Sequence, residues 1–146
     1  MRFSLFFLSF ATYVLCSACK KESSDDSCEL SMSSLSGDYQ MISIISKGSN
    51  GEVINQFDTA DECVKDNMWT FAPNGFLYVK DIGLQCGTIS ANVETWSLSG
   101  NEMHVSNSTI GAIVKITNFS CNQFSYEGTD SYNGVTYVTT VTLKRY

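Results

Sequence analysis

Few side chains in this chain have types and spacings that suit catalysis. His104 is the only histidine, and Glu102 and Ser106 lie two residues before and after it. Such a set could support nucleophilic catalysis, with the imidazole taking the serine proton. However, the three residues alternate with Met103 and Val105, which predicts a strand with the polar set on its solvent face. Side chains two apart on a strand are separated by ~6–7 Å, too far for proton transfer, so we predict no catalytic site and no enzyme.

An acidic cluster is the second candidate for chemistry. Asp58, Asp61, Glu62 and Asp66 lie within nine positions and could hold calcium. Their spacing does not match the alternating carboxylates and the glycine of a calcium loop. A short helix near residues 59–64 with an acidic first turn explains the cluster more simply. We therefore predict no metal site and no cofactor.

The start of the chain combines a basic residue, an apolar run and a cysteine. Arg2 precedes a mostly apolar run from Phe3 to Leu15, and small residues precede Cys19. This pattern is typical of a secretory signal peptide, and a run of about 13 residues is too short to span a bilayer. With the cysteine in this place, the segment resembles a bacterial lipoprotein signal. That resemblance implies removal of residues 1–18 and an acylated Cys19 that anchors the protein in the membrane.

The anchored protein would belong to the cell envelope. Lys20, rather than aspartate, follows the lipidated cysteine. Some lipoproteins carry an aspartate there and stay at the inner membrane, so we expect the outer membrane of a Gram-negative bacterium.

Five cysteines follow the leader, and with Cys19 lipidated four remain, an even number that suits disulfides in an exported protein. Four cysteines allow three connectivities. We favour Cys63–Cys86, because these residues flank one predicted hairpin, and by elimination Cys28–Cys121. A cysteine metal site is the alternative, but the only C-x-x-C spacing, Cys16 to Cys19, is destroyed by the predicted cleavage.

Composition indicates a single domain without a concentrated basic surface. Removing residues 1–18 leaves 128 of the 146 residues, enough for a single core. The net charge of −6 includes Arg2, so the mature chain would carry −7. The scattered basic residues argue against a nucleic-acid partner and against electrostatic membrane docking. Residues 19–34 are polar and read as the lipidated N-terminus and a tether, followed by a domain over residues 35–146.

The domain consists almost entirely of strand signals. Asn74-Gly75, Gly100-Asn101 and Asn133-Gly134 each separate two runs of strand-forming residues, which predicts three hairpins. The last strand alternates from Val135 to Leu143, with Tyr137, Thr139 and Val141 on the same face. We expect eight or nine short strands in an all-β, up-and-down barrel of about eight strands, with a two-sheet sandwich as the alternative.

Several motifs in order resemble the small lipocalin-like domain of bacterial lipoproteins. They are Leu35-Ser36-Gly37-Asp38-Tyr39, the segment from Asp61 to Asn67, Thr70 to Gly75, Cys86, Thr95 to Asn101, and the closing strand from Tyr137 to Tyr146. Tyr39 departs from the tryptophan usual in lipocalins, so its hydroxyl needs a partner when buried. The resemblance implies a barrel with an apolar cavity and leaves the biochemical role open.

Aromatic and large apolar side chains are the best candidates for a binding site. An eight-stranded barrel has room to be filled by side chains or to hold one small ligand. We expect most of these residues to pack the core and a few to line a pocket. The cavity candidates are Tyr39, Met41, Trp69, Phe71, Phe76, Tyr78, Trp96, Phe124, Tyr126 and Tyr137.

The sequence leaves two candidate functions. The first is binding of a small apolar or amphipathic molecule inside the barrel of a membrane-anchored lipoprotein. The alternative is a non-enzymatic interaction module, such as an inhibitor or accessory subunit of an envelope protein. Its site would be loops, with residues 47–55 and 81–90 as candidates.

Overall fold

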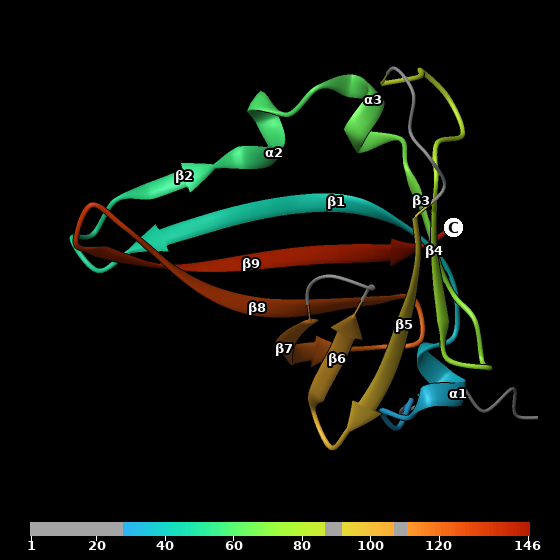
Figure 1. Cartoon of the computed structure of the whole chain (residues 1–146). Helices are drawn as coiled ribbons and strands as arrows, with labels where there is room; N and C mark the ends of the chain where they lie inside the picture. Colours follow the sequence, from blue (N-terminus) through green and yellow to red (C-terminus); the bar gives the residue numbers. More distant parts are fainter. Residues whose placement is uncertain (1–27, 87–91, 107–110) are drawn as a thin grey trace, which may run out of the picture.

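The computed structural model describes residues 28–86, 92–106 and 111–146. Strands dominate, with three single-turn helices among the described residues (Figure 1). In chain order the elements are α1 (Met32–Leu35), β1 (Gly37–Gly48), β2 (Val53–Asn55), α2 (Gln56–Thr59), α3 (Glu62–Lys65), β3 (Met68–Phe71), β4 (Phe76–Lys80), β5 (Asn92–Ser99), β6 (Glu102–Ser106), β7 (Gly111–Phe119), β8 (Gln123–Tyr132) and β9 (Val135–Arg145).

The predicted all-β barrel is confirmed. From β3 to β9, each strand pairs antiparallel with the next along the chain, and β1 pairs with both β3 and β9. This double pairing closes a barrel of eight strands, β1 and β3–β9, and leaves β2 as a ninth strand at the far end of β1. Closure satisfies the backbone groups that open sheet edges would leave unpaired.

The three expected hairpins are present, and their turns explain why. Gly75 and Gly100 have φ of 84° and 60°, and both Asn133 and Gly134 have positive φ. Asparagine and glycine adopt this left-handed backbone at little cost, and two such residues in a row match the twist of a hairpin. The last turn pairs Tyr132 directly with Val135 and so starts the long β8–β9 ladder.

A bulge in β1 changes which side chains face inward. The sequence alternation places Tyr39, Met41, Ser43 and Ile45 on one face. In the structure the register shifts between Met41 and Ser43, so that Tyr39 and Met41 are buried before the bulge and Ser46 after it. One extra residue, the 42 % exposed Ile42, thus moves the buried face from odd to even positions.

Beyond the barrel, four strand segments continue as an extension that we call the tongue (Figure 1, left). It consists of residues 45–48 of β1, all of β2, residues 128–132 of β8 and residues 135–140 of β9. The pairing of β8 with β7 runs from Phe124 to Glu127, so the later residues of β8 pair with β9 alone. The tongue therefore projects past the closed ring of strands.

The segment expected to form one helix near residues 59–64 forms two short ones. Asn55 caps α2 by accepting the backbone N–H of Asp58, and α2 ends at Thr59. Asp61 takes the N-cap position of α3 but makes no side-chain cap. The extended backbone at Ala60 and Asp61 separates the two turns.

The folded unit begins before Leu35, where the sequence suggested a tether. Leu30 and Met32 pack against the core, and Leu35 is completely buried. Ser31 caps α1 through reciprocal hydrogen bonds with Ser34. Among the described residues, the buried core runs from Leu35 to Leu143, and the two disulfides join Cys28 to Cys121 and Cys63 to Cys86. The described residues therefore include a hydrophobic core that begins at Leu35.

Candidate functional site

Four aromatic rings fill the closed end of the barrel. Phe71 lies at the centre, with edge-to-face contacts to Tyr39, Trp96 and Phe124 at centroid distances of 5.8, 5.3 and 5.6 Å. Tyr39 and Phe124 also meet edge-to-face at 5.1 Å. This geometry matches the preferred arrangement of aromatic quadrupoles. Together with Met41, which is 9 % exposed, Tyr39, Trp96 and Phe124 are thus core residues.

The polar atoms of these rings are satisfied. The Trp96 indole N–H donates to the carbonyl of Ala72 at 3.0 Å, and the Tyr39 hydroxyl donates to the carbonyl of Leu35 at 3.0 Å. Burial raises the pKa of Tyr39, while the Arg145 guanidinium acts in the opposite direction. This end of the barrel is therefore filled by packed side chains whose polar atoms are paired.

A cavity of about 160 Å³ adjoins this packed end, and the two share Phe71. Its lining is apolar apart from the tyrosine hydroxyl and the tryptophan N–H. The lining residues are Trp69, Phe71, Leu77, Met103, Val105, Ala112, Val114 and Tyr126. Its volume is close to that of an engineered cavity of about 150 Å³ that binds benzene, so it suits a ring-sized apolar group.

Trp69, Phe71 and Tyr126 were expected in such a cavity, and the structure brings them together there. The sequence-based candidates do not include the aliphatic lining residues Leu77, Val105, Ala112 and Val114 or the neighbouring Met103. Their signal was present, because Met103 and Val105 alternate with polar neighbours, and Ala112 and Val114 share one face of a predicted strand.

The cavity lining has two polar groups of its own, the Tyr126 hydroxyl and the Trp69 indole N–H. Burial raises the pKa of Tyr126 to about 12, so its hydroxyl stays protonated at neutral pH. The Trp69 indole nitrogen is buried and has no hydrogen-bond partner in the described part of the chain. An unpaired buried donor is costly, and in a native protein it calls for an explanation such as a ligand or a water molecule.

The expectation that Phe76 and Tyr78 line the interior is wrong. They are 39 % and 38 % exposed, and Leu77 between them is buried. The turn ending at Gly75 pairs Phe71 with Leu77. Directly opposite residues share a face of the sheet, so Leu77 joins Phe71 inside and its two aromatic neighbours point outward.

Tyr137 also lies outside the cavity, in a groove of about 500 Å³ on the tongue. Its hydroxyl donates to the Glu52 carboxylate at 2.9 Å, and this hydrogen bond raises its pKa. Gln56 donates to Ser46, whose hydroxyl also bonds Thr139. The polar lining of the groove is thus largely paired within itself.

His104 lies on β6 between Ser97 of β5 and Ile113 of β7. Its neighbours Met103 and Val105 line the cavity, so His104 lies on the opposite, outer face. Glu102 and Ser106 are exposed on the same face.

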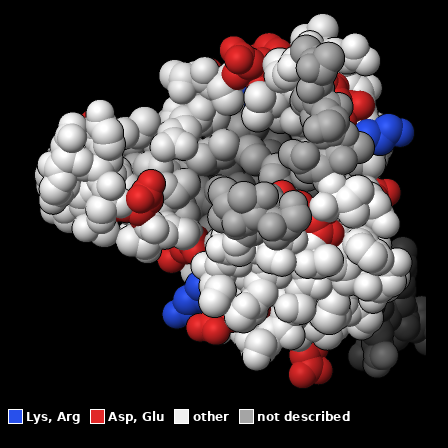
Figure 2. Space-filling view, viewed as in Figure 1, with Lys and Arg blue, Asp and Glu red and all other residues white. Residues whose placement is uncertain are grey.

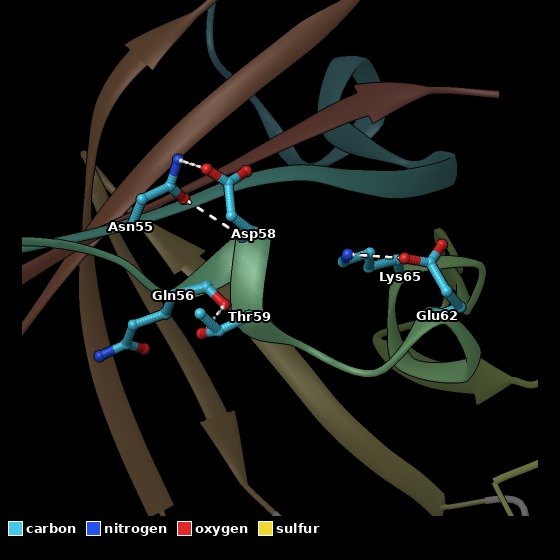
Figure 3. A network of polar contacts seen from close by, with 6 residues as sticks. All are labelled: Asn55, Gln56, Asp58, Thr59, Glu62 and Lys65. Atoms are coloured by element: carbon cyan, nitrogen blue, oxygen red, sulfur yellow. Dashed lines mark hydrogen bonds and ion pairs between the residues drawn. The ribbon is translucent and has the colours of Figure 1, made fainter.

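The acidic cluster is divided among separate partners (Figure 3). The Asp58 carboxylate accepts from the Asn55 amide at 2.8 Å, and Glu62 pairs with Lys65 at 2.8 Å. Within the described ranges, no three His, Cys, Asp or Glu side chains are placed to hold a metal ion. The face in Figure 2 has scattered acidic side chains and few basic ones, which lie apart from one another.

Both favoured disulfides are present, Cys28–Cys121 and Cys63–Cys86. The first fixes residues 28–35 beside the turn between β7 and β8, and the second joins α3 to the segment after β4. The proposed lipidation residue Cys19 lies outside the described residues. No described helix has the length and hydrophobicity needed to cross a bilayer.

Comparison with protein-family models finds no match, and comparison with curated proteins finds no significantly similar one.

Proposed function

We propose that this protein is a membrane-anchored envelope lipoprotein whose barrel binds a small apolar or amphipathic molecule. The observation that carries the proposal is the interior cavity, with its apolar wall and the unpaired N–H of Trp69. Cavities this small and apolar accept compact apolar groups from water, and the unpaired donor favours a molecule with one acceptor atom.

The envelope location has independent support. Two disulfides persist in oxidising compartments, and the leader with Cys19 resembles a lipoprotein signal. A short polar segment between Cys19 and Cys28 would then hold the barrel within about 30 Å of the membrane. Replacing Cys19 by alanine is expected to release the protein from the membrane fraction and abolish incorporation of labelled palmitate.

Binding is tested with residues 20–146 exported to a periplasm and purified without detergent. Ethylbenzene is the probe, because its ring fits the cavity and it has no polar atoms. Trp69 lines the cavity, so we expect saturable quenching or enhancement of tryptophan fluorescence together with calorimetric heat. Absence of saturable binding up to the solubility limit would contradict the proposal.

An interaction module is the second candidate, favoured by the exposed apolar side chains of the tongue. Val53 and Tyr132 are 64 % and 70 % exposed on two of its strands. Exposed apolar side chains of this kind mark protein-binding surfaces when they form a continuous patch. Affinity capture with the wild-type protein and with a Val53→Asp, Tyr132→Ser variant tests the interaction function. A protein-interaction module should retain a stoichiometric partner on the wild type and lose it on the variant.

A further inference from the structure

The described residues contain four buried side-chain polar atoms without a hydrogen-bond partner, and all come from neighbouring positions. They are Oδ1 of Asp66, Oδ1 of Asn67, Nε1 of Trp69 and Oδ1 of Asp81. Native proteins pair nearly all such atoms, so a concentration of four at the start of β3 and the end of β4 requires a local explanation.

Strand register places two of these side chains, those of Asn67 and Asp81, beside the cavity that Trp69 lines, and Asp66 directly precedes Asn67. Trp69 pairs with Val79 and Met68 with Lys80, so one further step sets Asn67 opposite Asp81. Alternate residues of a strand share a face, which puts Asn67 on the same inward face as Trp69, one layer above it. Asn67 is only 8 % exposed, although its carbonyl oxygen has no partner in the described part of the chain.

The two carboxylates are held in place by backbone donors. The second oxygen of Asp66 accepts the N–H of Leu84 at 2.6 Å, and that of Asp81 accepts the N–H of Cys86 at 3.2 Å. The Cys63–Cys86 disulfide ties this segment to α3. Each carboxylate therefore has one oxygen fixed by the protein and one that is buried and unpaired.

No cation offsets these carboxylates among the residues that the structure describes. The one ion pair there joins Lys65 to Glu62. Lys80 precedes Asp81 but lies on the exposed, outer face of β4. Buried carboxylate oxygens without a positive partner are unfavourable, and a ligand that supplies positive charge and N–H donors would compensate for them.

We propose that the cavity takes an amphipathic amine, with a ring-sized apolar body in the barrel and a protonated amino group between Asp66, Asn67 and Asp81. This inference rests on the proposed binding function and specifies its ligand class. Three unpaired acceptors match the three donors of an ammonium group, and an acceptor atom on the ligand would pair the indole N–H of Trp69.

The test uses four probes that share a phenyl ring: phenethylamine, 2-phenylethanol, phenylacetate and ethylbenzene. Calorimetric titration at pH 7 and low salt is expected to give at least tenfold tighter binding of phenethylamine than of 2-phenylethanol. Phenylacetate is expected to bind more weakly than both. In Asp66→Asn and Asp81→Asn, the preference for the amine should shrink at least fivefold while ethylbenzene affinity stays the same.

The design separates this inference from the proposed function. Asparagine keeps a carbonyl oxygen for the backbone donors, and Asp130→Asn on the tongue is the matched control with unchanged binding. If ethylbenzene binds and the amine has no advantage, the amine assignment is overturned and the cavity function stands. If neither probe binds, both fail. Saturable calcium binding that Asp81→Asn abolishes would instead overturn the amine assignment in favour of a cation site.

Should either aspartate variant fail to fold, Trp69→Phe provides a second measurement on a folded protein. It removes the indole N–H and leaves the carboxylates intact. The amine advantage over 2-phenylethanol should then persist, and its disappearance would contradict a site built on the carboxylates.

Discussion

The guanidinium of Arg145 lies over the ring of Tyr39, 5.0 Å from its centroid, and donates to its hydroxyl at 2.8 Å. The same side chain donates to the carbonyls of Ser34, Ser36 and Cys121 at 2.8, 3.1 and 3.0 Å. One residue at the end of β9 thus joins α1, the start of β1 and the turn before β8. It covers Tyr39, one of the four rings that fill the packed end of the barrel.

Arg145→Lys should lower the free energy of unfolding by about 2–3 kcal/mol, because an ammonium group cannot reproduce the planar fork that reaches several acceptors. Urea denaturation monitored by circular dichroism provides the measurement. Lys144→Ala is the matched control, since the neighbouring side chain is exposed, and it should change stability by less than about 0.5 kcal/mol. Equal effects of the two substitutions would contradict the role assigned to Arg145.

Stability should fall at alkaline pH because of Tyr126. Its pKa is about 12 in the folded protein and about 10 in the unfolded chain. Between these values the folded state holds a proton that the unfolded state has lost, so stability present below pH 10 declines as the pH rises towards 12. The full effect is about 3 kcal/mol.

Comparison with Tyr126→Phe isolates this contribution from that of Tyr39, which burial also shifts upward. The variant should lose less stability than the wild type between pH 10 and 12. Parallel pH profiles for the two proteins would show that Tyr126 ionises normally in the folded state.

The two disulfides should contribute unequally to stability. Cys28–Cys121 spans 93 residues of sequence and Cys63–Cys86 spans 23. On the chain-entropy estimate, replacing both cysteines of a pair by serine costs about 5 kcal/mol for the first and about 3 kcal/mol for the second. Denaturation of the two double variants tests this order, and a larger cost for Cys63–Cys86 would indicate that local contacts outweigh loop length.

Ligand access should depend on Ala112, which lies in the cavity lining yet is exposed at its upper edge. Ala112→Phe places a ring in the cavity and should weaken ethylbenzene binding at least tenfold while the thermal midpoint changes little. Ile113→Phe is the control, because Ile113 is 63 % exposed on the outer face of the same strand. Calorimetry on both variants makes the comparison, and equal binding by the two would place the ligand elsewhere.

Much of the fold could be predicted because its signals are local. The Asn133-Gly134 turn and the alternation from Val135 to Leu143 define the β8–β9 hairpin without reference to the rest of the chain. The disulfide Cys63–Cys86 followed from its position around the β3–β4 hairpin. Turn chemistry and period-two alternation act over a few residues, so one sequence carries them.

The directions of individual side chains could not be predicted, because they depend on register, which is a property of strand pairs. The bulge at Ile42 and the outward direction of Phe76 and Tyr78 follow from how strands align. A shift of one residue moves every side chain to the opposite face. The unpaired oxygens of Asn67 and Asp81 likewise become neighbours only when β3 and β4 pair, so the polar cluster beside the cavity could not be predicted.

Native mass spectrometry would show whether the interior cavity holds a ligand. Residues 20–146 would be exported to a periplasm, purified without detergent and measured beside Ala112→Phe and Ile113→Phe. We expect a discrete non-covalent added mass on the wild type and on Ile113→Phe, lost on denaturation and missing from Ala112→Phe. A bare wild-type mass that also fails to take up added ethylbenzene would contradict a ligand-binding barrel.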